Sequence, residues 1–579
     1  MNPIIKNILF SIRELFSKEK IKCLKCGEAI RGIEKLVFYS VVSAIFLVAF
    51  VMRFRSYSAP FSGPDTIGYL GVAFQYLDKG FFGSIAERTY PYPLFLTVII
   101  SIFKDASVIT VIQHTLGLIA GFLFLRIWLS VDLMFLKLSG ISKYFYWSVG
   151  VVGLYVLLCS DWSVNIEHFS HPESLTTFLI ISLVAIYLKL YQSCIQKSPF
   201  ALILFYGISS FLINYLIFKY QPRYGVNLIF VALAFCIILF KNLDKEKASL
   251  VIISSIIVTY TLLILPFSTF SDKGLSKLNR AGMFFFYNLK VIAPLIESDL
   301  ESVEMDAKKK LLLENILADL EKAKDPNNNF STGFSKSLGL NADYLIRTYY
   351  KVLEFHGHPV RAADFYISYL KRVVISHPFE LMMKIIREIL GFYSNDVMFT
   401  MMDDKQKIWD NSYNLMTLTF KSHFPNNEVL TKYTNSLNLI RKDQVHLEPF
   451  APIFSNIFFI QVIAKKILPA ISIIFLALLL LNLKWRNKYY KFGLFVLSLM
   501  ILQLGFNVTI SIANTNYVLR YLCDQLAVIM LFESFALVFI VLYICHLLRV
   551  LYQNIVDLFR SSYIRRSSGR SHQDQSLLF

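Results

Sequence analysis

The sequence predicts an all-α polytopic membrane protein with about ten transmembrane helices and a mainly helical extracytoplasmic domain. Of its 579 residues, 55% are hydrophobic and 17% are charged, whereas soluble proteins carry about a quarter charged residues. Apolar runs of about 18 to 25 residues, the length that crosses a hydrocarbon core, recur along the chain. The net charge is +18, but the basic residues gather in short links between these runs. That pattern follows the positive-inside rule and argues against nucleic-acid binding.

The chain begins with residues 1–35, which we expect to lie on the cytoplasmic membrane surface as an amphipathic segment. Ile4 and Ile8 are part of a helical repeat of apolar residues between lysines and arginines, a pattern typical of interfacial helices. Residues 36–265 then form the predicted transmembrane module. Its first span covers residues 36–52.

An outer loop, residues 53–104, follows the first span. Its last part, residues 91–104, is apolar but too short to cross a bilayer, which predicts a half-inserted or juxtamembrane helix. Residues 456–546 supply the C-terminal spans, and residues 547–579 form a basic cytoplasmic tail that is expected to be disordered after Arg560. The spans predicted after the first are residues 107–128, 144–160, 172–190, 199–218, 225–240, 248–265, 456–483, 490–507 and 519–546.

The basic links also predict the orientation of the chain. Lys137, Lys197 and Lys245 belong to links that lie on the same side as both termini. Because positive links stay on the cytoplasmic side, both termini are expected there. The loop at 53–104 and the long polar segment at 266–455 are then extracytoplasmic.

The segment at 266–455 is expected to form one mainly helical domain. Helical spacing and helix-forming composition recur at residues 301–324 and 341–356, which flank an Asn-rich loop. Residues 361–392 predict two amphipathic helices joined at residues 377–378. Their apolar faces suit either the membrane or the transmembrane bundle.

Asp65 in the outer loop is the candidate general base. Gly-Pro-Asp is favourable turn sequence by itself, so a solvated turn residue is the plain alternative. However, a short amphipathic stretch follows Asp65, and the chain re-enters the membrane at residues 88–94. The loop is thereby held against the bilayer at both ends, where a carboxylate faces lipid-borne substrates.

A second outer cluster of acids and histidines joins the third and fourth spans. Polar groups near membrane depth are costly and tend to be functional. The cluster is interpreted as a solvated loop cap, as a wall that contacts sugar hydroxyls, or as a divalent metal site. Because Pro172 breaks the helix that would align metal ligands, we assign no metal and no other cofactor, and a divalent ion stays the minor alternative. The cluster comprises Asp161, Glu167, His168, His171 and Glu173.

Two basic connections are expected on the same outer side. Lys219 and Arg223 lie between the fifth and sixth spans, and Arg520 opens the last span. A guanidinium group binds phosphate in a bidentate manner, so these residues are candidates for phosphate binding. The alternative is an interfacial anchor of basic and Tyr side chains, which is equally common at membrane edges. His114, inside the second span, is expected to be a hydrogen-bonded packing residue.

In their order and common sidedness, these residues resemble the multispanning C-type (GT-C) glycosyltransferases that use polyprenyl-phosphate sugars. The resemblance covers residues 36–265 best. Many members carry an acidic pair in the first outer loop, whereas Thr66 follows Asp65 here, so the role of base falls to one residue. The motifs that carry the resemblance are Pro64-Asp65 with Tyr69, the re-entry at Tyr90-Pro91-Tyr92-Pro93-Leu94, Pro172-Glu173, and Arg520-Tyr521.

The resemblance implies a GT-C-like membrane enzyme that moves a hexosyl or pentosyl unit from a polyprenyl-phosphate donor to a hydroxyl of a lipid, glycan or protein acceptor. Asp65 would act as general base in one inverting displacement, at the outer face of a bacterial cytoplasmic membrane. The implied partners are the donor, the acceptor and membrane lipids, without nucleic acid. The donor phosphate would be bound by Lys219, Arg223 and Arg520, and the sugar or acceptor by Tyr69, Tyr521 and the second cluster.

A lipid or glycan transporter, such as a flippase, is the main alternative. Transporters tend to place charges inside their spans and to consist of repeated halves. The charges of this sequence crowd at the outer ends of the spans, and no repeat is visible in it. A structural or polymer-assembly membrane protein without catalysis is a further alternative.

Overall fold

The computed structural model describes residues 24–55, 59–62, 66, 68–80, 91–221, 224–266, 273–302, 305–326, 334–335, 339–392, 405–442, 467–485, 489–513 and 520–573. The chain divides into two compact units, residues 1–48 and 49–579. The helix α2, Leu24–Phe54, is the first described element. Apart from this helix, which crosses the boundary at residue 48, all described elements belong to the second unit.

Eight helical segments of the described chain are long and apolar enough to cross a membrane. Each coincides with a predicted span, which confirms the all-α polytopic fold class. The segments are Ile33–Phe54, Ser107–Leu136, Gly140–His168, Glu173–Ile195, Phe200–Tyr220, Lys245–Ile264, Tyr490–Ile512 and Gln525–Phe559. The helices that form them after α2 are α5 (Ser107–Val131) with η2 (Asp132–Leu136), α6 (Gly140–Cys159), α7 (Asp161–His168), α8 (Glu173–Ile195), α9 (Phe200–Tyr220), α11 (Lys245–Thr259) with η4 (Tyr260–Ile264), α24 (Tyr490–Ala513) and α25 (Arg520–Gln573).

Three shorter apolar helices complete the set in the described residues. The helices α10 (Gly225–Asn242) and α23 (Leu468–Trp485) correspond to the other two predicted spans and have 18 residues each. At 1.5 Å per residue, each is about 27 Å long, close to the thickness of a hydrocarbon core. The third, α4 (Pro91–Phe103), is the short helix expected at the end of the outer loop.

The spans pack closely because glycines let large rings enter between them. Trp128 of α5 is fully buried and stacks on Tyr146 of α6 and on Phe535 of α25, with 4.4 Å between ring centroids in both pairs. A Cβ atom at Gly150 would lie 2.3 Å from Trp128 Nε1, so only glycine fits there. Such close packing of helices around small residues is typical of transmembrane bundles.

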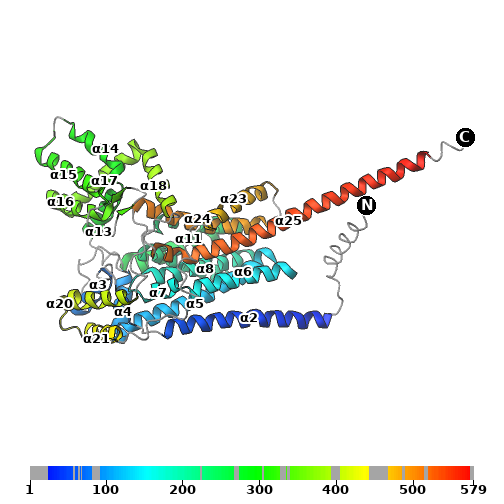
Figure 1. Cartoon of the computed structure of the whole chain (residues 1–579), viewed down its shortest axis with the longest axis horizontal. Helices are drawn as coiled ribbons and strands as arrows, with labels where there is room; N and C mark the ends of the chain where they lie inside the picture. Colours follow the sequence, from blue (N-terminus) through cyan, green and yellow to red (C-terminus); the bar gives the residue numbers. More distant parts are fainter. Residues whose placement is uncertain are drawn as a thin grey trace. The chain divides into compact units, whose positions relative to one another are not determined.

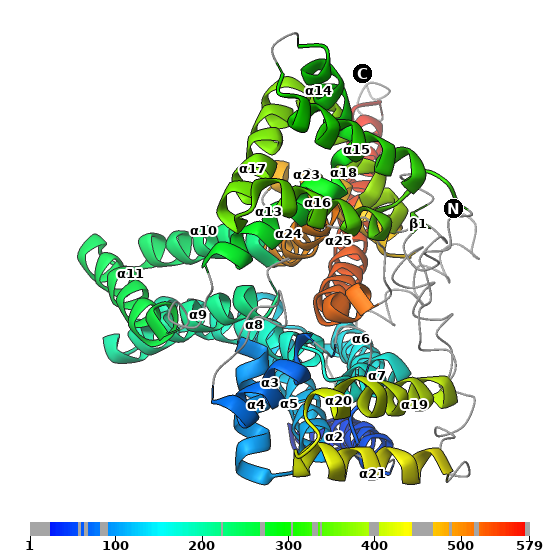
Figure 2. The ribbon, with the colours of Figure 1, turned by 90° about the vertical axis from the view of Figure 1, so that its left-hand side faces the viewer.

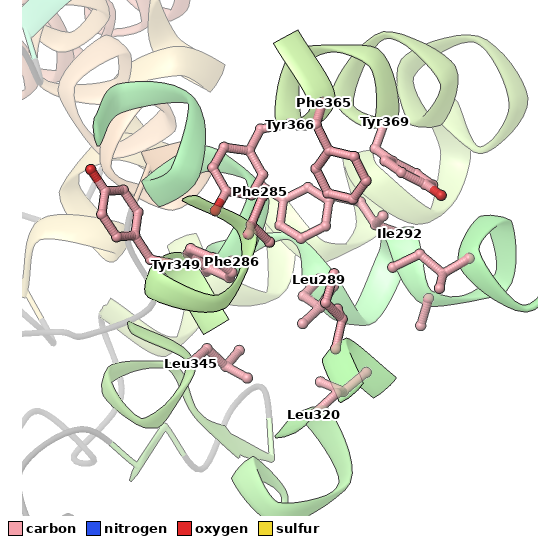
Figure 3. Packing of buried hydrophobic residues seen from close by; sticks show 14 of the residues in the cluster. Phe285, Phe286, Leu289, Ile292, Leu320, Leu345, Tyr349, Phe365, Tyr366 and Tyr369 are labelled. Atoms are coloured by element: carbon pink, nitrogen blue, oxygen red, sulfur yellow. The ribbon is translucent and has the colours of Figure 1, made fainter. Parts of the chain in front are cut away.

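Helices α13 to α18 form a separate group with its own apolar core (Figure 3). The rings of Phe285, Phe365, Tyr366 and Tyr369 meet at its centre. The two amphipathic helices predicted at 361–392 are confirmed, and Pro378 begins the second of them, where its missing N–H costs nothing. The elements are α13 (Lys273–Tyr287), α14 (Leu289–Leu300), α15 (Ala307–Ala323), the short antiparallel pair β1 (Phe334–Ser335) and β2 (Leu340–Asn341), η5 (Ala342–Leu345), α16 (Ile346–His356), α17 (Pro359–Ser376) and α18 (Pro378–Phe392).

The rest of the described polar segment packs elsewhere. Helices α19 (Lys405–Asn414), η6 (Leu415–Phe420), α20 (Lys421–His423) and α21 (Glu428–Lys442) lie beside α3 (Leu70–Lys79) and α4 (Figure 2). Phe74 of α3 contacts the rings of Phe420 and Phe424. The described residues of the segment predicted as one domain at 266–455 therefore form two groups, both at the same end of α5, α6 and α8 (Figure 1).

The last helix, α25, has 54 residues and continues to Gln573. The expectation of a disordered tail after Arg560 is therefore wrong as far as residue 573. Arginines in this stretch are good helix formers, and no proline interrupts it.

Candidate functional site

The outer loop is attached to the second polar cluster just before Asp65. The N–H of Phe61 donates to the carbonyl of His168 (2.6 Å), and the N–H of Ser170 donates to the carbonyl of Phe61 (3.1 Å). These bonds make a parallel bridge between Phe61 and Phe169. Asp65 itself lies outside the described residues.

The loop meets the same cluster again just after Asp65. Thr66 Oγ1 lies 3.4 Å from His171 Nε2. The ring of Tyr69 packs against His171 and edge-on against Tyr92, with centroid distances of 5.8 and 5.3 Å. All four side chains are buried. Both flanks of Asp65 therefore contact the segment that contains His168 and His171.

A buried ion pair lies behind this segment. Arg53, at the end of α2, donates through Nε to Glu167 Oε2 (2.7 Å) and through Nη2 to Glu167 Oε1 (2.8 Å). Its Nη1 donates to the carbonyl of Leu158 (2.7 Å). The side chain of Arg53 is 1% exposed. A bidentate pair with further hydrogen bonds is the arrangement in which a buried charge pair is compensated.

Two histidines extend this pair toward the loop. His114 Nδ1 lies 2.7 Å from Glu167 Oε2, and His114 Nε2 lies 3.2 Å from His168 Nε2. Because a carboxylate only accepts hydrogen bonds, the His114 proton is on Nδ1. In the neutral ring, Nε2 of His114 then accepts from Nε2–H of His168. The hydrogen bonds run in one direction, from His168 through His114 to Glu167, and this fixes both rings.

Gln113 connects the cluster to α4 and α8. Its Nε2 lies 2.7 Å from Ser174 Oγ, 3.1 Å from Tyr92 Oη and 3.2 Å from the carbonyl of His171. Glu173, also buried, begins α8, where a negative charge faces the positive end of the helix dipole. Its Oε2 is 4.0 Å from His171 Nδ1. The described residues of the cluster thus form one packed polar block.

The space beside Glu167 is small. A cavity of about 20 Å³ is bordered by Gly117, Ser163, Glu167, Ser174 and Thr177. That volume holds a water molecule but not a sugar ring. The cavity is therefore of the size of a water molecule, and the polar block packs directly against the loop.

The described donors do not fit a divalent metal ion. In the metal interpretation, His168 and His171 bind one ion, but their Nε2 atoms face His114 and Thr66, respectively. The Arg53 guanidinium occupies both oxygens of Glu167. Within the described ranges, no group of three or more His, Cys, Asp or Glu side chains is arranged to hold a metal.

A second set of contacts holds the loop from the other side. The N–H of Ser62 donates to Ser412 Oγ (2.8 Å), which donates in turn to the carbonyl of Ser62 (3.2 Å). Ser62 Oγ lies 3.0 Å from Tyr433 Oη, and that hydroxyl donates to the carbonyl of Pro60. Burial raises the pKa of Tyr433, so its hydroxyl keeps its proton. We call these contacts of Ser412 and Tyr433 with residues 60–62 the loop clamp.

The predicted phosphate-binding residues are less fully described. Lys219 lies near the end of α9, and its ammonium group is 5.3 Å from the Tyr215 ring and 5.6 Å from the Phe218 ring, a cation–π arrangement that suits an interfacial anchor. Arg223 lies outside the described residues. Tyr224 packs on Phe506 of α24, which brings this connection next to the end of that span. The side chains of Asp161, Arg520 and Tyr521 also lie outside the described residues, although their helices are described.

Sequence reasoning missed the residues that hold the cluster together. The sequence predicts that Arg53 begins the outer loop, and it assigns no role to Gln113. Gln113 gave a usable signal, because it lies inside a long apolar run and polar groups at membrane depth need partners. Arg53 lies at the end of such a run, which is an ordinary place for a basic residue. Ser412 and Tyr433 gave no such signal, since they lie in a polar segment.

Comparisons with known proteins place few limits on this arrangement. No protein-family model and no curated protein matches the chain. Among solved structures, the chain is similar to the apo form of the oligosaccharyltransferase of Archaeoglobus fulgidus, with 13% sequence identity and a TM-score of 0.38. The match covers 90% of this chain and 52% of that enzyme, so this chain spans about half of that enzyme's length.

Proposed function

We propose that the chain is a membrane glycosyltransferase that moves a sugar from a polyprenyl-phosphate donor to a hydroxyl acceptor. The observation that carries the proposal is the attachment of the outer loop on both sides of Asp65. Phe61 and Thr66, which flank Asp65, contact the segment at 168–171, and the loop clamp holds residues 60–62. General-base catalysis requires a carboxylate that is held in place, and these contacts on both sides of Asp65 support that role for it.

The reaction is one displacement at the anomeric carbon. The acceptor oxygen forms a bond to that carbon while the bond from the carbon to the phosphate oxygen breaks. The acceptor proton passes to the Asp65 carboxylate, and the leaving polyprenyl phosphate keeps the electron pair. A single displacement inverts the anomeric configuration. The proton on Asp65 is lost to water before the next turnover.

The negative charge that develops on the phosphate needs cationic partners. We assign this role to Lys219, Arg223 and Arg520, because guanidinium and ammonium groups stabilise departing phosphate. Lys219 and Arg223 belong to the connection whose Tyr224 packs on α24, and Arg520 opens the helix that follows α24. The two basic connections are therefore near the same span.

The remaining predicted residues contact the sugar or the acceptor in this proposal. Tyr69 belongs to the loop, and His171 and Glu173 lie in the segment that the loop contacts. Asp161 begins α7, and Tyr521 lies in the first turn of α25. The sequence predicts the same contact with sugar or acceptor for Glu167 and His168. Their described contacts, however, are with Arg53, His114 and the backbone of the loop. For these two residues, the contacts support positioning of the loop.

The experiment is complementation of a strain that lacks the chain, with envelope glycans measured by mass spectrometry. Asp65→Asn should fail to restore the missing sugar while the protein accumulates normally in the membrane. Asp78→Asn is the matched control, because Asp78 lies exposed at the end of α3 in the same loop. Restoration by Asp65→Asn would refute the assignment of the base.

Transport of a lipid-linked glycan is the second candidate. The observation that favours it is Glu533, an acid that lies buried inside the span of α25, since acids within spans often mark transport paths. Vesicles that hold a labelled polyprenyl-phosphate sugar separate the two functions. Movement of the intact lipid across the bilayer that depends on Glu533 would favour transport, whereas release of the sugar to an acceptor supports transfer.

A further inference from the structure

Helix α18 has an inverted distribution of polar and apolar side chains. Its buried face carries two charged residues, Lys384 and Glu388, and the latter is 0% exposed. Its outward face carries the exposed apolar residues Phe379, Met382, Ile386 and Leu390, and the first and last of these are 64% exposed. A helix that packs on a protein core in water shows the opposite distribution.

The buried charges fix α18 to the end of a membrane span. Lys384 Nζ lies 3.1 Å from Glu388 Oε1 and donates to the carbonyl of Ser511 (2.5 Å). Asn288 Nδ2 donates to the next carbonyl, that of Ile512 (3.0 Å). Both carbonyls belong to the last turn of α24, where helix carbonyls lack partners within the helix. Helix α18 therefore lies at the same depth along the membrane normal as the end of the span formed by α24.

The exposed apolar residues form one continuous stripe. Phe379, Met382, Ile386 and Leu390 recur every three or four residues, so their side chains lie on one side of the helix. The stripe extends into the last turn of α17, where Val374 and Ile375 are also exposed. Exposure of so many large apolar side chains along one stripe is uncommon in soluble proteins and marks an interaction surface.

We propose that α18 is an interfacial helix whose apolar stripe inserts among the acyl chains of the leaflet in which α24 ends. Two observations favour lipid over a protein partner. The helix is attached to the end of a span, where the bilayer surface must lie. In addition, Glu380 and Arg387 are exposed, and they lie about 90° from the stripe around the helix axis. Helices that lie in a headgroup region carry polar residues at this position. This proposal is independent of the glycosyl-transfer reaction.

The experiment places single spin labels on the full chain in lipid nanodiscs and compares collisions with oxygen, which dissolves in lipid, and with a water-soluble nickel chelate. Phe379→Cys and Ile386→Cys report on the stripe. Ile253→Cys, exposed on the span of α11, is the lipid control, and Glu314→Cys, exposed on α15, is the aqueous control. The signal from the seven native cysteines is measured on the unsubstituted chain and subtracted.

The expected result is that both stripe positions match Ile253→Cys, with a several-fold lower nickel accessibility than Glu314→Cys. Nickel accessibility equal to that of Glu314→Cys would overturn the proposal, because the stripe would then face water. Protection from both reagents would overturn it as well, and would indicate that a second copy or another protein covers the stripe.

Discussion

The side chains around Glu167 illustrate how a charge is kept inside a membrane-spanning bundle. Arg53 engages both carboxylate oxygens, and His114 adds a third hydrogen bond. The electrostatic attraction of such a pair is offset by the cost of its desolvation. The pair therefore adds little to the free energy of unfolding while both partners are present. Removal of one partner leaves the other charge buried and alone, which is far more costly.

The first prediction is that Arg53 and Glu167 are strongly coupled. Arg53→Met should lower the free energy of unfolding by about 3–5 kcal/mol, because Glu167 then stays buried without its partner. The double variant Arg53→Met with Glu167→Gln should recover most of this loss. Unfolding in mixed micelles measures all variants in one double-mutant cycle. Costs that simply add would contradict the coupling.

The second prediction concerns the space that Glu167 needs. A Cβ atom at Gly117 would lie 2.0 Å from Glu167 Oε1, so Gly117→Ala must displace the carboxylate from Arg53. We expect a loss of at least about 1–3 kcal/mol, the usual cost of overpacking. Gly225→Ala is the control, because its Cβ would make only an ordinary contact of 3.5 Å with Phe218. Equal thermal stability of the two variants would contradict the geometry.

For these residue pairs, the sequence identifies one partner of each interaction and not the other. Glu167, His168 and His171 attracted notice because acids and histidines are rare in an apolar chain. Arg53 did not, because the end of a span is an ordinary place for a basic anchor. The sequence contains no information about which side of α2 faces α7, and that rotation is what makes Arg53 a partner of Glu167.

Among the elements, the contact between α19, α21 and the outer loop has the clearest functional consequence. The loop clamp holds Pro60 and Ser62, which precede Asp65 in the outer loop. It joins positions that are 350 or more residues apart in the sequence. The function proposed for Asp65 therefore depends on helices that contribute no reacting group.

The third prediction is that the loop clamp positions Asp65. Tyr433→Phe and Ser412→Ala each remove hydrogen bonds to residues 60–62, so kcat for sugar transfer should fall by about tenfold or more while the KM for the donor changes little. Ser436→Ala, whose hydroxyl binds only a carbonyl of its own helix, is the control. Native kcat in both clamp variants would contradict the positioning role.

The fourth prediction concerns pH and the packing of α14 on α17. Arg372 and Tyr369 donate to Asp299, and the hydrogen bond from Arg372 holds the pKa of Asp299 below its ordinary value. Because the folded pKa is lowered, the stabilisation is present above the ordinary pKa of about 3.9 and is lost as the pH falls through the folded value. The partners are partly exposed, so its size is about 1 kcal/mol or less.

Asp299→Asn should therefore lower Tm at pH 7, and the difference should shrink as the pH falls below about 3.9 toward the lowered folded pKa of Asp299. Glu301→Gln, an exposed neighbour, should have no effect at either pH. Differential scanning calorimetry in detergent measures both variants. A constant difference between Asp299→Asn and the native chain across this range would contradict the assigned pKa direction.

The helices themselves could largely be predicted. Long apolar runs require helices in a bilayer, because only a helix satisfies its backbone groups internally. The division of the segment at 266–455 could not be predicted, since it depends on contacts such as Phe74 with Phe420 that join distant parts of the chain. Helical periodicity identifies an apolar face but does not identify what covers it.

For the whole molecule, we expect one reaction at one membrane face. The outer loop, the two basic connections and the two helix groups of residues 266–455 would all serve it. The groups formed by α13 to α18 and by α19 to α21 lie at the same end of α5, α6 and α8 (Figure 1). The charge of the links predicts that this end is extracytoplasmic and that both termini are cytoplasmic.

The account is tested most directly by the rate at which the purified chain, in liposomes with extracted acceptor, releases labelled sugar from polyprenyl phosphate. A correctly placed general base contributes about 10²- to 10⁴-fold to a rate. Asp65→Asn is therefore predicted to reduce the rate by at least about 100-fold, while Asp78→Asn keeps the native rate. An Asp65→Asn protein that turns over at the native rate would contradict the account.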